Sequence, residues 1–262
     1  MADVRYEKID HVAVITLDRP NNANSLNQNV MREELPAAWQ QARDDKEVRA
    51  IVFTGSGDRF FCSGVDLRDT AALGGGGPNT GGGGAAPELR ITARQNDVWK
   101  PVITAVNGHA VGGGLMFVGD SDVVIASENA RFSNTGVSIA IIAPVGPVIM
   151  ARKIPFEAVM RMMIVGRHEY IDAQRALQLG LVSEVTKPEA LMDAAMDVAG
   201  KVAKNSPLAV QQVVRMMWET RELPMSEAVT ASLTYGAPLR GHPDAAEGPR
   251  AWLEKREPQW SS

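Results

Sequence analysis

Residues 101–119, Pro-Val-Ile-Thr-Ala-Val-Asn-Gly-His-Ala-Val-Gly-Gly-Gly-Leu-Met-Phe-Val-Gly, join an apolar strand to three consecutive glycines that open a helix. The first N–H groups of a helix have no partner within the helix and carry partial positive charge. Glycine also lets a ligand oxygen approach the backbone closely. The junction is therefore predicted to stabilise an anion or a polarised carbonyl oxygen.

A second loop of the same character follows the apolar residues 48–54. Residues 55–67 read Gly-Ser-Gly-Asp-Arg-Phe-Phe-Cys-Ser-Gly-Val-Asp-Leu. Two backbone N–H groups, one from each loop, are enough to clamp one carbonyl oxygen. The alternative interpretation of the glycine triplet is close packing of a helix against a strand. A dinucleotide or phosphate loop is disfavoured, because residues 108–114 do not match Gly-x-Gly-x-x-Gly and the sequence has no Gly-Lys-Ser/Thr.

The composition is that of an ordinary globular protein. A chain of 262 residues can build one large core or a core plus a helical appendage, and 45% hydrophobic with 22% charged residues is ordinary for a globular protein. The formal net charge of -4 predicts no nucleic-acid partner. The single cysteine, Cys62, excludes an internal disulfide framework. Because no signal peptide and no membrane span are recognisable, a cytoplasmic protein is expected.

Strand and helix patterns alternate over the first two thirds of the chain. Predicted strands cover residues 6–17, 48–54, 102–106 and 122–126. Predicted helices cover residues 27–43, with Asn27 as the cap, 88–99 and 113–118. This alternation favours an α/β core. Beyond Ile171 the patterns are almost entirely helical, so the tail is predicted to be a helical region.

Several further motifs occur in a distinctive order. They are Leu-Asp-Arg-Pro with Asn24-Ser25-Leu26-Asn27, Phe-Cys-Ser-Gly-Val-Asp-Leu at 61–67, Lys100-Pro101 through Gly114, Ile171-Asp172-Ala173, Gly180-Leu181-Val182, Glu247-Gly248 and Glu254-Lys255-Arg256. In this order the chain resembles the enoyl-CoA hydratase/isomerase, or crotonase, superfamily over nearly its whole length. The resemblance implies an α/β fold: a spiral of β-β-α repeats with an acyl-CoA site over residues 1–200. It also implies a helical trimerisation region over residues 201–262, a homotrimer or hexamer, and lyase or isomerase chemistry in fatty acid metabolism.

The resemblance implies where a thioester would bind. In the family, the thioester carbonyl oxygen lies between two backbone N–H groups, which match Val65 and Gly113 here. A coenzyme A thioester is then the implied substrate or ligand. No permanently bound cofactor and no metal site are expected.

The family's coenzyme A contacts match backbone positions of two loops. These positions are Asn22, Ala23, Ser63, Asp66 and Leu67. Asp66 is equally explained as a residue that caps or forms a turn. Many relatives have a lysine where this chain has Asn21, so Arg68 and Lys255 are the candidates for phosphate contacts.

The chain departs from the family at two positions that decide the chemistry. Hydratases carry two glutamates that hold and activate water, and these positions are Met116 and Gly136 here. Neither residue can transfer a proton. Residues 137–144 also contain no acid, although some relatives place one there. The sequence therefore predicts an apolar pocket and very weak hydration of enoyl-CoA.

Other side chains are further candidates for an acid, a base or a nucleophile, or lie in regions that could line the pocket. His109 lies four residues before Gly113 and Cys62 lies near Val65, while Glu88 and Asp97 fall on the helix expected at 88–99. Each also has an ordinary structural explanation. Met150, Met160, Met162 and Met163 suit either a plastic core or an acyl tunnel. The glycine-rich residues 74–84 are either a surface excursion or a lid.

Two functions follow from these observations. The first is an enzyme of the superfamily that acts on an acyl-CoA through two backbone N–H donors, without the hydratase glutamates. The second is a non-catalytic acyl-CoA carrier or sensor that uses the same pocket.

Overall fold

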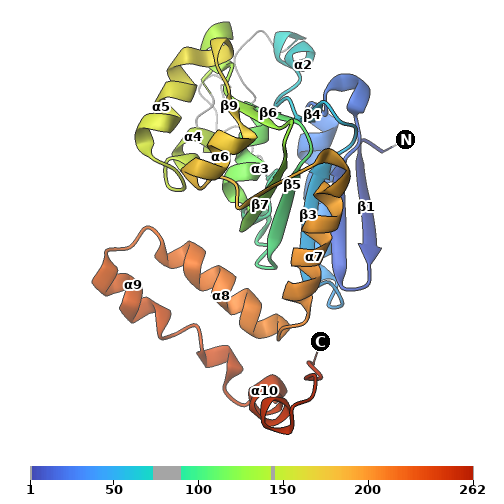
Figure 1. Ribbon diagram of the computed structural model, residues 1–262, viewed down its shortest axis with the longest axis vertical. Helices are drawn as coiled ribbons and strands as arrows, with labels where there is room; N and C mark the ends of the chain where they lie inside the picture. The colour runs from blue at the N-terminus through green and yellow to red at the C-terminus, as the bar shows by residue number, and fades with distance from the viewer. Residues whose placement is uncertain (1, 73–89, 143–144, 262) are drawn as a thin grey trace.

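The computed structural model describes residues 2–72, 90–142 and 145–261. Figure 1 shows two sheets surrounded by helices, from which α8 (Pro207–Thr220), α9 (Met225–Ser232) and α10 (Pro243–Glu254) extend away. These three helices, with the residues after them, are called the arm below. The predicted boundary at residue 200 falls in the last turn of α7 (Leu191–Ala203) and stays a prediction.

The large sheet has the order β1-β2-β3-β5-β7-β10. Its strands are β1 (Val4–Ile9), β2 (Val12–Leu17), β3 (Ala50–Gly55), β5 (Val102–Val106), β7 (Val123–Ser127) and β10 (Glu184–Thr186). All neighbours pair in parallel except β1 and β2. The single strand predicted over residues 6–17 is wrong, because Asp10 takes a left-handed conformation (φ 51°) that turns the chain back as a hairpin.

The small sheet has the order β4-β6-β8-β9. Its strands are β4 (Phe60–Cys62), β6 (His109–Val111), β8 (Arg131–Ser133) and β9 (Ile171–Asp172). The chain therefore repeats one unit, in which a strand of the large sheet is followed by a strand of the small sheet and then a helix. These helices are α2 (Leu67–Ala72), α3 (Gly114–Asp120) and α4 (Val145–Met150). The predicted spiral of β-β-α repeats is confirmed.

The core lies on both faces of the large sheet. Strands β2 and β3 are buried along their whole length, which explains their continuous apolar sequences. On one face, Phe53 packs against Trp39 of α1 (Leu35–Asp44) and Phe117 of α3, with ring centroids 5.3 and 4.7 Å apart. On the other face, α7 packs with Ala195 and Ala199. The helix predicted over residues 27–43 consists of a π-helix, Val30–Glu34, followed by α1, and the Asn27 Oδ1 accepts the Val30 N–H at its start, at 2.7 Å.

The helix predicted over residues 88–99 is wrong within its described part. Residues 90–99 contain only a 3-10 helix, Arg94–Asn96, which ends at Asp97 in a left-handed conformation. Side chains replace the helical hydrogen bonds here: Gln95 Oε1 accepts the Ile91 and Thr92 N–H groups, and Asn96 Nδ2 donates to the Thr92 carbonyl. Glu88 and residues 74–84 lie outside the described residues.

Polar contacts join α10 to the start of α8 and to the residues that follow α10. Ser206, at the N-cap of α8, donates to Asp244 of α10 at 2.6 Å. The Arg256 guanidinium donates to Glu247 at 2.6 Å. Hydrogen bonds from Arg256 and then Arg250 hold the pKa of Glu247 well below its usual value. Two motifs near the end of the sequence thus fasten α10 to the residues that follow it.

Large apolar side chains are exposed along the arm. Met225 is 79% exposed, Leu233 76%, Trp252 85% and Leu253 81%. Exposed apolar surface of this extent is typical of an interface between subunits. No helix among the described residues is long and apolar enough to cross a membrane.

We expect the protein to form a trimer or hexamer in which these arm residues are covered. Light scattering at micromolar concentration measures the mass. Trp252→Glu should lower the assembled fraction, because a charge would then have to be buried. Lys201→Glu on the exposed face of α7 is the matched control. A monomer mass for the native chain would contradict the prediction.

Candidate functional site

Three loops meet at the carboxyl ends of β4, β6 and β8. The loop after β4 pairs with the loop after β2, because the Ser63 N–H donates to the Ala23 carbonyl at 3.1 Å and the Leu26 N–H donates to the Gly64 carbonyl at 2.8 Å. The Gly112 N–H donates to the Ser133 carbonyl at 3.1 Å and joins the other two loops. Segments far apart in sequence thus form one edge of the small sheet.

The predicted donor positions, Val65 and Gly113, lie next to each other at this edge. A β-carbon built on Gly113 would lie 3.6 Å from the Val65 nitrogen and 3.3 Å from the Gly64 α-carbon. Gly64 has a φ of 84°, and a β-carbon there would lie 2.8 Å from the Gly113 nitrogen. Within residues 2–72, 90–142 and 145–261, neither the Val65 nor the Gly113 N–H has a hydrogen-bond acceptor. Both residues are partly exposed.

The third glycine of the triplet has a packing role. A β-carbon on Gly114 would lie 2.4 Å from the Cys62 carbonyl oxygen, so only glycine fits at this start of α3. Close packing therefore explains Gly114, while Gly113 lies beside the second loop and its role as an N–H donor to an anion stays a prediction.

Cys62 is fully buried beneath this contact, and burial raises the pKa of its thiol to about 12. A hydrogen bond from the Gly64 N–H to Sγ opposes this rise only partly. A thiol with so high a pKa is almost entirely protonated at neutral pH. The geometry does not support Cys62 as a nucleophile.

We expect Cys62 to resist alkylation by iodoacetamide at pH 8 in the folded protein. The raised pKa alone lowers the thiolate fraction by roughly 10³-fold relative to a free cysteine. Intact-mass measurement with and without urea tests this: modification should require urea. Complete modification of the folded protein within minutes would contradict the assigned burial.

The Asp66 side chain is held by neighbouring residues of the two loops. It accepts hydrogen bonds from the Ser25 hydroxyl (3.0 Å) and the Arg68 N–H (3.1 Å), and it lies 3.6 Å from the Arg19 guanidinium. Burial raises the pKa of Asp66, but these hydrogen bonds and the Arg19 charge outweigh burial and keep the pKa below its usual value. These contacts favour the turn-forming role of the Asp66 carboxylate.

The other predicted coenzyme A positions divide into two groups. Asn22, Ala23, Leu67 and Arg68 lie on the two paired loops or on α2 directly after them, and Arg68 is exposed. Lys255 ends α10, which Figure 1 shows at the opposite end of the molecule from α2 and β4. Within one chain, the fold therefore does not bring Lys255 to the other candidates.

Met116 and Gly136, the two positions at which the sequence predicts that the hydratase glutamates are replaced, follow β6 and β8, which are neighbours in the small sheet. Met116 lies on the first turn of α3, where its N–H donates to the Gly113 carbonyl at 3.1 Å, and its side chain packs partly buried beside Gly146 of α4. Gly136 is buried, and a β-carbon there would lie 2.5 Å from the Ile141 carbonyl oxygen. Position 136 is thus closed to any side chain by neighbouring backbone.

The remaining candidates have structural surroundings. His109 packs edge-on against Phe60, with centroids 5.4 Å apart, and its pKa is lowered by burial and then by the charges of Arg131 and Arg59. Asp97 is exposed. Of the four methionines, Met150 and Met162 are core residues, Met163 packs partly buried against the core, and Met160 is 39% exposed.

One residue that holds the loops together was missed at the sequence level. The buried Asn24 side chain donates to the carbonyls of Ser56 (2.9 Å) and Phe60 (2.8 Å) and accepts the Arg19 N–H (2.9 Å). Asn24 also has a φ of 50°, which asparagine tolerates better than most residues. Its position within the Asn-Ser-Leu-Asn motif was the available signal.

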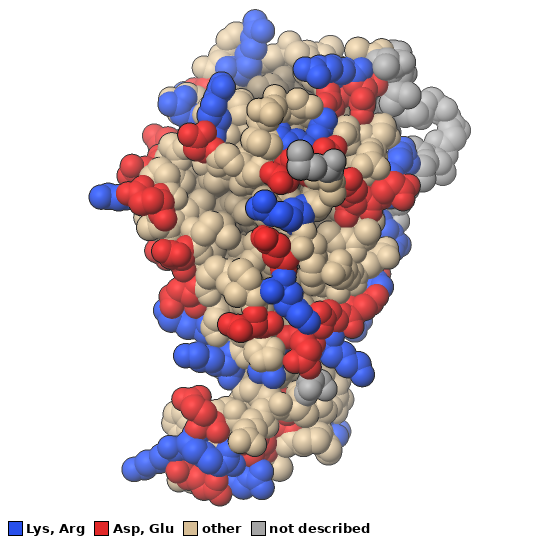
Figure 2. Space-filling view, turned by 90° about the vertical axis from the view of Figure 1, so that its right-hand side faces the viewer, with Lys and Arg blue, Asp and Glu red and all other residues tan. Residues whose placement is uncertain are grey.

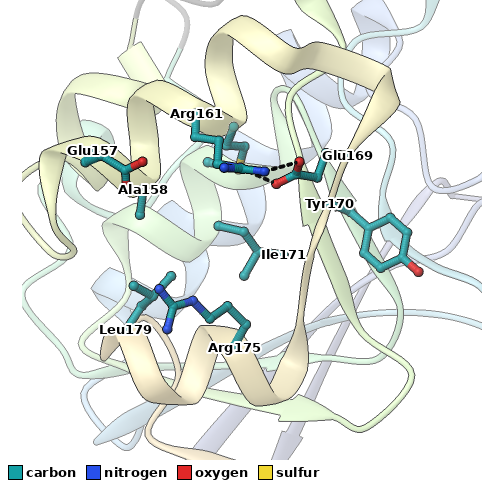
Figure 3. A pocket seen from close by; sticks show the side chains of 9 residues that line it. Glu157, Ala158, Arg161, Glu169, Tyr170, Ile171, Arg175 and Leu179 are labelled. Carbon is teal, nitrogen blue, oxygen red and sulfur yellow. Dashed lines mark hydrogen bonds and ion pairs between the residues drawn. The ribbon is translucent and has the colours of Figure 1, made fainter.

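A separate hollow of about 310 Å³ lies between α5 (Phe156–Val165), β9 and α6 (Ala173–Leu179). Figure 3 shows the Arg161 guanidinium paired with Glu169 across its rim, at 2.7 and 2.9 Å, above Ile171. None of its lining residues belongs to the loops that carry Val65 and Gly113. This hollow is therefore distinct from the candidate site.

Charge is mixed over the surface. Figure 2 shows Lys and Arg side chains interspersed with Asp and Glu over one face, in keeping with the small net charge. In the part of the chain that the structure describes, no group of His, Cys, Asp and Glu is arranged to hold a metal ion. The absence of a nucleic-acid partner stays a prediction.

Two sheets joined by β-β-α repeats, with helices after them, define a protein of the crotonase fold. A crystal structure of an enoyl-CoA hydratase/isomerase from Mycobacterium paratuberculosis superposes with a TM-score of 0.89 at 37% identity, covering 99% of this chain and 98% of that one. The family model for enoyl-CoA hydratase/isomerase matches residues 7–262. The chain belongs to the enoyl-CoA hydratase/isomerase family.

Two curated relatives are similar over nearly their whole length. The (E)-benzylidenesuccinyl-CoA hydratase of Thauera aromatica is 36% identical over 259 residues, covering 97% of each chain. The carnitinyl-CoA dehydratase of Proteus mirabilis is 35% identical over 254 residues, covering 95% of this chain and 94% of the relative. Both names describe enzymes that process CoA thioesters.

Proposed function

We propose that this protein binds an acyl-CoA with the thioester carbonyl oxygen between the N–H groups of Val65 and Gly113. The observation that carries the proposal is the close approach of the two loops, with the Val65 nitrogen 3.6 Å from the β-carbon position of Gly113. Both N–H groups lack an acceptor among the described residues. Two such donors stabilise the negative charge that develops on a thioester oxygen when it becomes an enolate.

The residues at positions 116 and 136 bear on the chemistry that follows polarisation of the carbonyl. Because positions 116 and 136 hold methionine and glycine, we infer that the chain lacks the two hydratase carboxylates that activate water. We infer an enzyme of fatty acyl-CoA metabolism, with lyase or isomerase chemistry that uses another acid or base. For the acyl group of the substrate, the benzylidenesuccinyl and carnitinyl groups in the names of the relatives are the first candidates to test.

The coenzyme A end is proposed to bind along the paired loops at Asn22, Ala23, Ser63 and Leu67, with Arg68 near a phosphate. Since Lys255 lies at the far end of its own chain, it can take part only from a neighbouring copy. This is a second reason to expect a homotrimer or hexamer, built through the helical region of residues 201–262.

A titration that compares butyryl-CoA with its thioether analogue S-butyl-CoA tests the carbonyl contact, since only the thioester has the oxygen. We expect tighter binding of the thioester. The absorption maximum of bound cinnamoyl-CoA gives a second measurement. The enoyl thioester is conjugated, so its absorption maximum moves to longer wavelength when the carbonyl is polarised. Equal affinities and an unshifted spectrum would refute the proposal.

A non-catalytic acyl-CoA carrier or sensor is the second candidate, and the loss of both carboxylates favours it. Turnover assays separate the two candidates. Crotonyl-CoA, (E)-benzylidenesuccinyl-CoA and carnitinyl-CoA form the panel. Thioester-selective binding without turnover of any of them would favour the carrier, while turnover of one would establish the enzyme and its acyl group.

A further inference from the structure

The short helix α3 connects the candidate site to a buried cluster of charges. It begins directly after Gly113 and ends at Asp120. Seven residues span only about 10 Å, and a hydrogen-bonded helix of this length moves as a unit. Contacts that hold its last turn therefore also set the position of its first turn.

The last turn of α3 is held by the ammonium of Lys153. Lys153 Nζ donates to the Val118 carbonyl at 3.2 Å and also to the Ser121 carbonyl. Carbonyl groups at a helix C-terminus have no helical partner and form the negative end of the dipole, so a cation is favoured there. Burial lowers the pKa of Lys153 to about 8. The negative charge of Asp122 acts in the opposite direction and limits this lowering.

A tryptophan of the arm covers this lysine. The Trp218 ring centroid lies 5.8 Å from Lys153 Nζ and 5.2 Å from the Arg94 guanidinium. The indole N–H donates to Asp122 Oδ1 at 2.6 Å. Asp122 lies two residues after the end of α3. Asp122 is fixed in turn, because Arg94 donates to both of its oxygens at 2.6 Å.

The cluster is more than a surface contact. The Asp120 carboxylate is buried and accepts the Arg94 N–H at 2.9 Å, and burial raises its pKa to about 6. Trp218 also lies 5.3 Å from the Arg221 guanidinium, which belongs to the arm. Cation–π contacts at such distances contribute more where water is excluded. The arm thus docks on the core at the C-terminal end of α3, the helix that begins directly after Gly113.

We propose that Lys153 and Trp218 are positioning residues for the acyl-CoA site, through which docking of the arm sets the placement of the Gly113 N–H. The inference rests on the proposed function, since the placement of that N–H matters only if it contacts the thioester carbonyl. Assembly of the arms and polarisation of the bound thioester are then linked properties.

The test uses Lys153→Met, which keeps the length of the side chain and removes the ammonium. The absorption of bound cinnamoyl-CoA and the ratio of affinities for butyryl-CoA and S-butyl-CoA are measured against the native protein. We expect the spectral shift to shrink and the affinity ratio to fall about 10-fold or more. Lys201→Met, which removes an exposed lysine of α7, is the control and should change neither value.

The outcomes separate this inference from the proposed function. No shift and no thioester preference in the native protein would overturn both. If the native protein shows the spectral shift of bound cinnamoyl-CoA and Lys153→Met shows the same shift, only the positioning role is overturned. If Lys153→Met does not fold, Trp218→Phe decides alone, since it keeps a ring and removes the N–H to Asp122. A reduced shift in that variant supports the proposal, and an unchanged one overturns it.

Discussion

Crotonyl-CoA hydration by the native protein is expected to be on the order of 10⁴-fold or more slower than in a hydratase with both glutamates. General acid and base groups contribute about 10²- to 10⁴-fold each, and Met116 and Gly136 supply neither. The loss of absorbance of the enoyl thioester measures the rate. A native rate of order 10 per second, ordinary for an enzyme, would show that another acid substitutes for the glutamates.

Restoring the glutamates is expected to fail at position 136. In the Met116→Glu and Gly136→Glu double variant, the new β-carbon at 136 would meet the Ile141 carbonyl oxygen at 2.5 Å, so backbone must move. Burial would also raise the pKa of both carboxyls. Met116→Glu alone, with Met116→Gln as its uncharged control, is the variant that keeps the fold. We expect the double variant to melt at a lower temperature than either single variant at position 116.

Gly64→Ala is expected to remove polarisation of a bound thioester. Alanine is strained at a φ of 84°, and its β-carbon would lie 2.8 Å from the Gly113 nitrogen and 2.9 Å from the Val111 carbonyl oxygen. The two donors would therefore be pushed apart. Loss of one oxyanion-hole donor typically costs about 10²- to 10³-fold in turnover. The spectral shift of cinnamoyl-CoA should disappear together with any turnover that the native protein shows.

Gly180→Ala is the matched control for this variant. Gly180 has a similar φ of 78°, but no atom lies within 4 Å of its β-carbon position. The control carries the same kind of backbone strain without the steric contact, so thioester binding should be unchanged. If both variants keep the spectral shift, the Gly64 loop does not hold the carbonyl.

The α/β core could be predicted from the alternation of strand and helix patterns, whereas the spiral was expected only from the resemblance to the crotonase superfamily, because β4, β6 and β8 have three residues each and are too short for a recognisable pattern. Each unit has a short apolar strand, a second strand and a small-residue loop, and Gly112 to Gly114 follow such a strand. The predicted helix at 88–99 failed because Gln95 and Asn96 side chains take the backbone hydrogen bonds within its described part. Such competition is not visible in hydrophobic periodicity.

By itself, the sequence determined the alternation of strands and helices, the two glycine-rich loops and the absence of glutamate at positions 116 and 136, since these depend on residue type and order. Only the tertiary structure decided which groups meet. It placed Gly64 against Gly113, buried the Cys62 thiol, carried Lys255 away from the coenzyme A loops and set Trp218 above Lys153. The physical reason is that each of these outcomes depends on packing between segments distant in the chain, which local pattern does not encode.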